Sequence, residues 1–324
     1  MAGKKVPLKA ATEELLDRVN DLYPTGTVFL DFEGDQVGYV RHDQAQQKAF
    51  PGGLMITLTD LTEPDYTASH ELLHLLMLLQ GFPQIFFQLS LGDDELDEQM
   101  MIMATDLYNV AMHTVVVDEQ RKHDLITDQI EDEYLAGIHE TLSDETADED
   151  NERTLRLLTL LDALVFYGDH LDRVADDLTK RYPLALKTAQ DLYALAFDKA
   201  IDSPYAMRRV IVRLFKLFDE QMKAWQLPPL HNLEFTTVSP VLSERQLRLS
   251  VKQVFEIFHS DMKNRESGEP AYVGLRRNDR QNSFVIDAPK GDTAAEFVKL
   301  YAQPVQEFLD QHGIPYIVRK WLNG

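Results

Sequence analysis

The most constraining feature of the sequence is the stretch TASHELLHLLMLLQGFP, residues 67–83. Its run of apolar residues predicts a helix over about 66–80, which a glycine and a proline end. Within this run stand His70, Glu71 and His74. Side chains four residues apart lie on the same face of a helix, so both imidazoles can point at one ion. The spacing therefore predicts a buried helix that presents one face to a bound metal.

The segments around this helix predict a small sheet and a second, longer helix. Residues 27–34, 36–42 and 53–60 are short, rich in β-forming side chains and separated by turn-forming residues, which predicts three strands. Residues 94–123 begin with carboxylates and end with basic side chains, as the helix dipole favours. We therefore expect an α+β fold in which the sheet packs on the buried helix that carries the two histidines.

The length of 324 residues predicts more than one domain, because single hydrophobic cores rarely grow so large. We expect residues 1–125 to form an α+β domain that contains the metal site. Residues 126–226 read as helical and are expected to complete a cleft. Residues 227–324 mix strand and helix patterns and predict a C-terminal α+β module without a chemical motif.

Composition and charge narrow the classes of function. The sequence has no cysteine, so a metal must be held by histidine and carboxylate. A formal net charge of -22 would repel nucleic acid and anionic lipid surfaces. No run of about 18 apolar residues predicts a membrane span, and the N-terminal residues lack the apolar core of a signal peptide. We therefore expect a cytoplasmic protein that binds neither nucleic acid nor membrane.

The letters HELLH match the motif H-E-x-x-H, in which the glutamate can reach a water bound to the metal. On the segment LMITLTDLTEPDYTASHELLHLL the sequence resembles the zincin class of metallopeptidases, over about residues 25–125. The resemblance implies a Zn²⁺ ion held by His70 and His74, with Glu71 as the catalytic base. The strand over 53–60 directly precedes the motif helix, an arrangement in which an edge strand can pair with an extended peptide, so we expect it to lie at a sheet edge and align a substrate.

A third zinc ligand has to come from a later helix, because Met77 and Gln80 stand where the extended metzincin motif has glycine and histidine. The segment LYNVAMHTVVVDEQ is similar to a helix of minimal zincin-like domains with the form N-x-x-x-acid, and here His113 replaces the acid. Neutral imidazole is a standard zinc ligand, and a metal would remove the cost of burying His113 among apolar neighbours. In the gluzincin alternative a glutamate is the ligand, and Glu98 or Glu119 would serve.

The same predicted helix carries two candidates for orienting a ligand imidazole, Asp106 and Asn109, which both precede His113. The sequence has no G-x-S-x-G, no P-loop and no G-x-G-x-x-G, which leaves serine hydrolase, nucleotide hydrolase and dinucleotide functions without support.

Two hypotheses about function follow. The first is a zinc-dependent metallopeptidase that hydrolyses a peptide, or a specific cytoplasmic protein, with water activated by the metal and Glu71. The second is a non-catalytic regulatory or interaction protein on a zincin scaffold, in which the metal is structural or lost. The sequence leaves the substrate, the oligomeric state and the role of residues 126–324 open.

Overall fold

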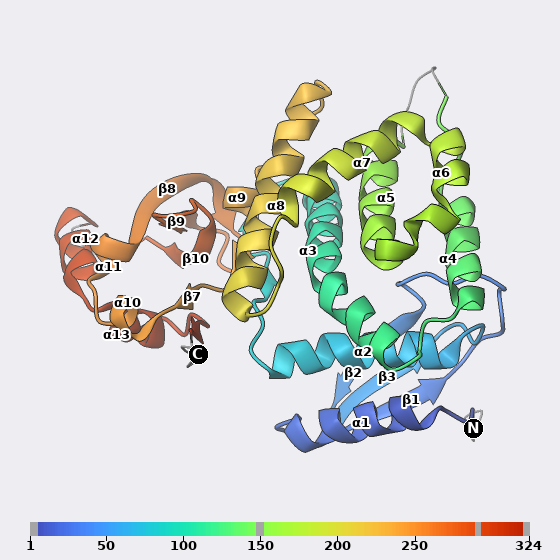
Figure 1. Ribbon diagram of the computed structural model, residues 1–324. Coiled ribbons are helices and arrows are strands. Elements are labelled where there is room, and N and C mark those ends of the chain that lie inside the picture. Colours follow the sequence, from blue (N-terminus) through green and yellow to red (C-terminus); the bar gives the residue numbers. More distant parts are fainter. Residues whose placement is uncertain (1–5, 147–151, 289–292, 320–324) are drawn as a thin grey trace. The chain divides into compact units, whose positions relative to one another are not determined.

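The computed structural model describes residues 6–146, 152–288 and 293–319 (Figure 1). Short groups of strands and runs of consecutive helices follow one another along the chain, and the expected α+β class is confirmed. The chain divides into two compact units, each built from two segments that are distant in the sequence. The first unit comprises Met1–Gln80 and Met112–Ala194, and the second comprises Gly81–Ala111 and Leu195–Gly324. The division into 1–125, 126–226 and 227–324 stays a prediction.

The first unit contains a three-stranded sheet. Its strands are β1 (Thr27–Phe32), β2 (Ala45–Phe50) and β3 (Gly53–Leu58). The order is β1-β3-β2, with β1 parallel and β2 antiparallel to β3. Because β3 pairs on both sides, the expectation that the strand over 53–60 lies at an edge is wrong. Among the described residues β2 is an edge strand of this sheet instead.

The predicted strand over 36–42 is also wrong, because residues 33–44 form a loop. The loop backbone takes up other hydrogen bonds: Val37 and Gly38 donate their N–H groups to the side chains of Asp60 and Thr62. Gly38 has a φ of 81°, a conformation that interrupts a strand. Of the two valines in this segment, Val40 is buried and Val37 is 51% exposed, so the apolar residues do not form the buried face of a strand.

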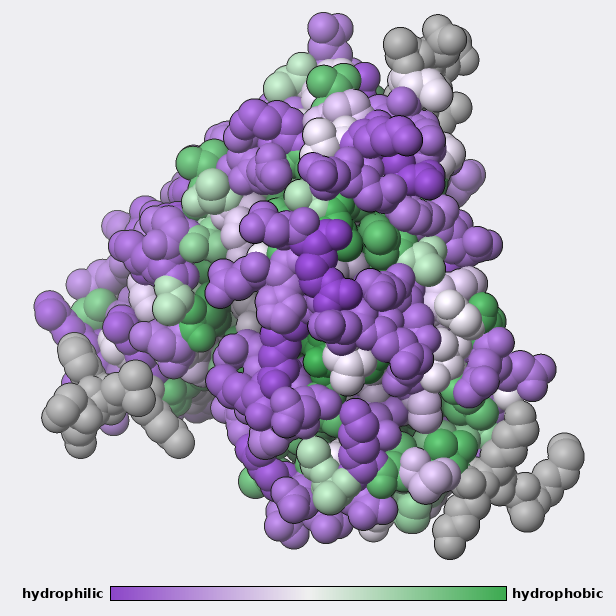
Figure 2. All heavy atoms as spheres, turned by 45° about the vertical axis from the view of Figure 1, so that its right-hand side comes forward, coloured by the Kyte–Doolittle hydropathy of each residue, from purple (hydrophilic) through white to green (hydrophobic). Residues whose placement is uncertain are grey.

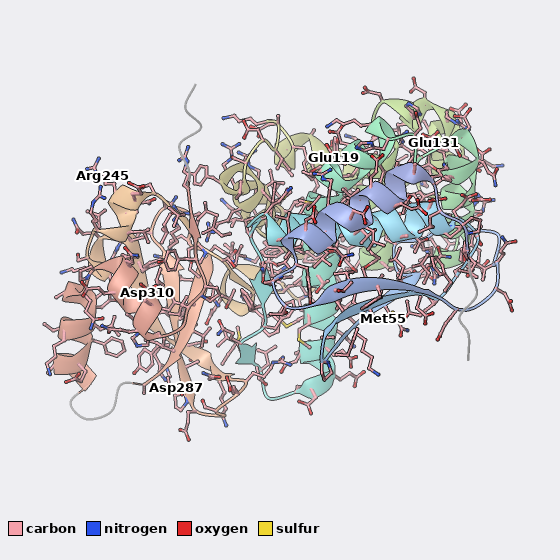
Figure 3. All side chains as sticks on the ribbon, turned by 90° about the horizontal axis from the view of Figure 1, so that it is seen from below. Met55, Glu119, Glu131, Arg245, Asp287 and Asp310 are labelled. Atoms are coloured by element: carbon pink, nitrogen blue, oxygen red, sulfur yellow. The ribbon has the colours of Figure 1, made fainter. Side chains whose placement is uncertain are left out.

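Helices complete the first unit. They are α1 (Ala10–Leu22), α2 (Pro64–Leu79), the second part of α3 (Asp94–Lys122), α4 (Asp128–Thr141), α5 (Arg153–Tyr167), η1 (Gly168–Arg173), α6 (Ala175–Arg181) and α7 (Pro183–Ala196). α1 and α2 contact each other and the sheet that contains Met55 (Figure 3). The buried side chains of β3, among them Ile56 and Leu58, alternate with half-buried ones, as one covered face requires. The helices predicted over 66–80 and 94–123 are confirmed within two residues.

The second unit is also α+β. Its strands are β4 (Ile85–Phe86), β5 (Leu89–Ser90), β6 (Thr237–Val238), β7 (Val241–Leu242), β8 (Phe255–Asn264), β9 (Pro270–Arg276), β10 (Asn282–Asp287) and β11 (Ile317–Val318). Its helices are the first part of α3, α8 (Pro204–Ala224), α9 (Asn232–Phe235), α10 (Glu244–Leu247), α11 (Val251–Val254), α12 (Thr293–Ala302) and α13 (Val305–Gln311). A sheet of order β10-β9-β8-β5 shares a core with the C-terminal helices, including Phe255, Phe284 and Phe308.

One helix of the described residues, α3, is long and apolar enough to cross a membrane by length and composition alone. Half of its most apolar stretch is buried inside the structure, and a helix of a protein core passes the same test, so this is weak evidence for a span. On the face shown in Figure 2, hydrophilic side chains predominate and hydrophobic ones occur in small groups.

Candidate metal centre

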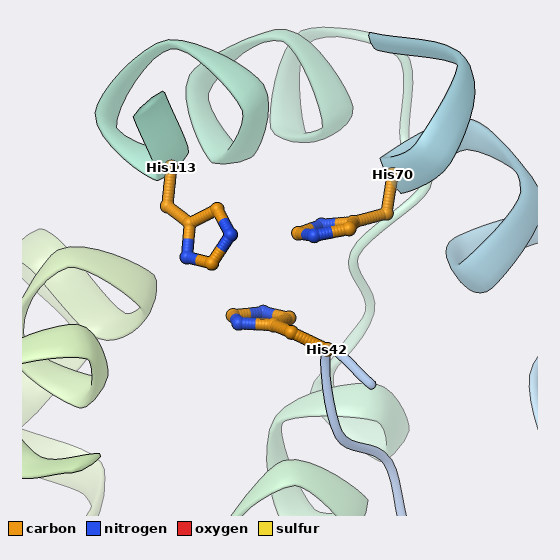
Figure 4. A group of neighbouring side chains, drawn as sticks. All are labelled: His42, His70 and His113. Atoms are coloured by element: carbon orange, nitrogen blue, oxygen red, sulfur yellow. The ribbon is translucent and has the colours of Figure 1, made fainter. Parts of the chain in front are cut away.

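Four imidazoles from three parts of the first unit meet in one cluster. His70 and His74 lie one turn apart on α2, His113 lies on α3, and His42 comes from the loop 33–44. α2 can carry polar side chains toward the interior because most of its remaining surface is buried and apolar. Figure 4 shows the rings of His42, His70 and His113 facing one another. The structure thus brings together the three histidines predicted to bind zinc and adds a fourth.

The rings of His70, His74 and His113 are arranged as ligands of one ion would be. His70 Nε2 and His74 Nε2 are 3.2 Å apart. The ring centroids are separated by 4.7, 4.8 and 5.1 Å, and the ring planes are mutually inclined by 60–76°. With zinc–nitrogen distances of about 2.0–2.1 Å and tetrahedral angles, the centroids of two imidazoles on one ion lie about 5 Å apart. The three rings therefore already have the separations of a three-histidine site.

His42 also lies within reach of a common ion, since one nitrogen of each of His42, His70 and His113 lies within 4.8 Å of the others. Its ring, however, stacks on that of His70, with a centroid distance of 4.4 Å and an interplanar angle of 11°. A metal bound by an imidazole lies near the plane of that ring, and two stacked parallel planes share no such position. We therefore assign the candidate ligand set to His70, His74 and His113.

Asp162 on α5 links two of the histidines through their Nδ1 atoms. Its Oδ1 accepts a hydrogen bond from His113 Nδ1 at 2.6 Å, and its Oδ2 accepts one from His42 Nδ1 at 2.8 Å. The hydroxyl of Tyr134 donates to Oδ2 at 3.2 Å. An ionised carboxylate only accepts hydrogen bonds, so both Nδ1 atoms carry the proton and both Nε2 atoms present a lone pair. For His42 this lone pair accepts a hydrogen bond from Tyr66, whose hydroxyl lies 2.7 Å from Nε2.

His113 Nε2 is a buried polar atom without a hydrogen-bond partner in the described structure. Leaving such an atom unpaired costs about 1–3 kcal/mol. In Figure 4, a ring nitrogen of His113 points toward the ring of His70. A cation at this position would accept the lone pair of Nε2. The unpartnered Nε2 is therefore the observation that best indicates that these residues suit a metal.

Burial keeps the three candidate ligands neutral. It lowers the pKa of His70 and His74 well below the ordinary value, and the neighbouring imidazoles lower it further. Burial also lowers the pKa of His113, although Asp162 acts in the opposite direction. Burial alone would raise the pKa of Asp162, but the attraction and the hydrogen bonds of His113 and His42 hold it well below its usual value. Neutral imidazole is the form that binds metal ions.

Glu71 follows the first ligand on α2 and is half-buried. Burial raises the pKa of its carboxyl group, and this outweighs the opposing effects of Gln47 and His42. Gln47 on β2 donates its Nε2–H to Glu71 Oε2 at 2.8 Å. This contact is possible because Gln47 pairs with the buried Ile56 of β3 and so faces the helix-covered side of the sheet.

The remaining predicted site residues all lie on α3. Glu119 forms an ion pair of 2.8 Å with Lys122 near the end of α3. It is six residues beyond His113 and therefore on a different face of the helix. Glu98, Asp106 and Asn109 belong to the part of α3 in the second unit. Their proposed roles as ligand or orienting residues stay predictions.

Sequence reasoning missed two residues of the cluster, His42 and Asp162. Asp162 carries a signal that could have found it, because it is the one charged residue among the eleven from Leu157 to Tyr167. A lone carboxylate on a buried helix requires a partner. His42 has no comparable signal, since its segment reads as an exposed strand.

No protein-family model, no curated protein and no solved structure matches this chain.

Proposed function

We propose that the protein is a zinc-dependent metallopeptidase of the H-E-x-x-H type, in which His70, His74 and His113 hold the zinc and Glu71 is the general base. One observation carries the proposal: the three rings have the separations and inclinations of ligands around one ion, and a buried Nε2 lone pair of His113 has no other partner among the described residues. The donor set of three neutral imidazoles suits zinc and leaves a fourth position open. The zincin-like packing implied by the motif is part of the same proposal.

The residues around the centre suit hydrolysis. A zinc ion held here would supply a Lewis acid for a peptide carbonyl and lower the pKa of water. Glu71 would take the proton from that water and deliver it to the leaving amine. Its raised pKa brings the carboxylate closer to neutral pH, where a general base is most effective.

β2 is the strand that we propose aligns a substrate. It is an edge strand among the described residues, its side chains are largely exposed, and Gln47 connects it to Glu71. An extended peptide could add to this edge through main-chain hydrogen bonds. The substrate class would be a peptide or an extended segment of a cytoplasmic protein.

The test separates metal binding from catalysis. Protein purified without chelator should contain about one equivalent of zinc, and should cleave members of a fluorogenic peptide library. Glu71→Gln should retain the zinc and lose about 10²–10⁴-fold in kcat/KM. Asp118→Asn is the control, because Asp118 is an exposed carboxylate that pairs with Lys122 on α3 and should leave activity unchanged.

Three outcomes decide between the hypotheses. Wild type that binds no zinc under saturating conditions would rule out both a metallopeptidase and a structural zinc site. Stoichiometric zinc without cleavage in either protein would favour the non-catalytic regulatory or interaction protein. Loss of zinc from Glu71→Gln would show that Glu71 is wrongly assigned as a base.

A further inference from the structure

We propose that His42 and Asp162 are positioning residues of the metal centre: they bind no metal themselves but hold two of its ligands, His113 and His70, in place. This inference rests on the metal-binding part of the proposed function and is independent of peptide hydrolysis. Four observations lead to it.

Asp162 fixes the orientation of His113. Its Oδ1 lies 2.6 Å from His113 Nδ1, although the two residues are 49 apart in the sequence. This hydrogen bond places the proton on Nδ1, and so directs the Nε2 lone pair of His113 into the cluster. Carboxylates that bind the remote nitrogen of a metal-ligating imidazole fix both its tautomer and its ring orientation.

The second oxygen of Asp162 is shared by His42 and Tyr134, at 2.8 and 3.2 Å. The carboxylate is therefore bound on both oxygens and cannot rotate without breaking hydrogen bonds to side chains from the loop, α3 and α4. A single charged group on α5 thus connects three elements that reach the cluster from different parts of the sequence. Its position is determined by all three.

His42 supports the other ligand. Both of its nitrogens are occupied, Nδ1 by Asp162 and Nε2 by the hydroxyl of Tyr66, which lies one turn before His70 on α2. Its ring stacks on the ring of His70 at 4.4 Å and 11°. The ring of His70 is therefore held by stacking on one side, while Asp162 holds His113. A chain of contacts therefore runs from His70 on α2 through His42 on the loop and Asp162 on α5 to His113 on α3.

The loop that carries His42 is itself anchored. Val40 donates its N–H to the carbonyl of Glu133 on α4 at 3.0 Å. Gly137, one turn further along α4, allows the close approach, because a Cβ there would lie 2.2 Å from the carbonyl oxygen of Val40. Gln44 at the end of the loop accepts a hydrogen bond on its carbonyl from Thr59 at 3.0 Å. These contacts hold the loop in place and so fix the position of the His42 ring beside His70.

The test measures zinc affinity by competition with a chromophoric chelator, together with the absorption spectrum of the cobalt-substituted protein. Asp162→Asn keeps the shape but provides one acceptor oxygen for two imidazole N–H groups, and we expect about 10–100-fold weaker zinc binding. His42→Ala should weaken zinc binding to a similar extent. Both variants should retain a four-coordinate cobalt spectrum, because the three ligands remain.

Two reference variants calibrate the result. His113→Ala removes a ligand and should weaken zinc binding far more than either positioning variant. Asp177→Asn breaks a comparable histidine–carboxylate pair in the same unit, in which Asp177 Oδ2 lies 2.7 Å from His139 Nε2. It should leave the affinity within about twofold of wild type. Millimolar imidazole should restore affinity to His42→Ala, an effect that a general loss of structure would not show.

The outcomes that would overturn the inference are distinct from failure of the proposed function. If Asp162→Asn and His42→Ala bind zinc within twofold of wild type, the two residues do not position the ligands. If His42→Ala loses as much affinity as His113→Ala and the cobalt spectrum loses one nitrogen donor, His42 is a ligand. If wild type and His113→Ala are alike in lacking zinc, the metal site itself is wrong. Circular dichroism identifies a variant that does not fold. If Asp162→Asn does not fold, the restoration of zinc affinity to His42→Ala by imidazole decides whether the inference holds.

Discussion

At the level of single residues, the cluster is defined by which nitrogen of each imidazole carries the proton. One carboxylate, Asp162, determines this for two of the four histidines. The centre therefore depends on a residue 120 positions away from His42 in the sequence, and neither residue is part of the motif. In the proposed centre, the side chains that would bind the ion and those that would hold them in place are different sets.

The lowered pKa values of His70, His74 and His113 predict how the stability of the metal-free protein depends on pH. In the unfolded chain these imidazoles take up protons below about pH 6.5. In the folded protein they do so only at lower pH. The unfolded state therefore binds more protons, and the free energy of unfolding should fall as the pH decreases from about 6.5, by up to about 1.4 kcal/mol per pH unit for each imidazole.

Urea unfolding of the chelator-treated protein between pH 5 and 8 measures this dependence. His74→Asn removes one of the three groups and should show a shallower decrease than wild type. A free energy of unfolding that rises as the pH falls from 7 to 5 would contradict the assigned burial.

The sequence predicts three histidines of the cluster better than it predicts their surroundings. His70, His74 and His113 follow from the spacing of HELLH and from the cost of a histidine in an apolar helix, which are local properties. Asp162 and His42 reach the cluster only through the packing of α5 and of a loop. Sequence periodicity does not show which distant side chains come into contact. The contacts of these two residues can therefore be identified only from the structure.

At the level of elements, α2 both carries His70 and His74 and packs into the core of the first unit, and different faces of the helix serve these two roles. Leu72 is fully buried within the first unit, whereas Leu78 on the same helix is 41% exposed. Truncating a buried leucine typically costs about 2–5 kcal/mol, because a cavity remains. Leu72→Ala should therefore lower the free energy of unfolding by this amount, and Leu78→Ala, the control, by less than about 1 kcal/mol.

Urea or thermal unfolding of the metal-free variants tests this difference. Equal effects of the two substitutions would mean that α2 does not bury the face that the structure assigns to the core.

The contact between α4 and the loop 33–44 provides a second prediction. Gly137→Ala places a methyl group 2.2 Å from the carbonyl oxygen of Val40, so the backbone of the loop has to move. We expect a loss of about 1–3 kcal/mol of stability, and weaker zinc binding because His42 moves with the loop. Helix propensity alone would make the same substitution stabilising by about 0.5–1 kcal/mol. The sign of the change in unfolding free energy therefore decides between the two.

The elements show where sequence reasoning succeeds and where it fails. α2 and α3 are long and strongly patterned, and their predicted bounds agree with the structure. The loop 33–44 is predicted as a strand because the β-forming residues Val37, Tyr39 and Val40 stand close together in it, although only Val40 of these is buried. The true strand β2, with the sequence AQQKAF, has almost no apolar alternation and escapes prediction.

At the level of the whole molecule, the chain forms two units of which the first contains every member of the cluster. A metal that binds the folded state stabilises it by mass action, by about 4 kcal/mol at a concentration 1,000 times the Kd. We expect zinc to slow amide hydrogen exchange in α2, α5 and the loop 33–44. The strands β8 to β10 of the second unit serve as an internal control and should exchange at an unchanged rate.

Hydrogen exchange followed by mass spectrometry, with and without zinc, measures both units in one experiment. Protection confined to β8–β10 would mean that the metal binds in the second unit and that the assigned centre is wrong.

The open edge of the first sheet has a consequence for solubility. A strand with unpaired backbone groups on one side is a template for pairing with a second copy of the same chain. β2 counters this with two glutamines and Lys48, and with little apolar surface to reward self-association. The features that hide this strand from sequence-based prediction are thus those that disfavour self-association at an edge that no described residue covers.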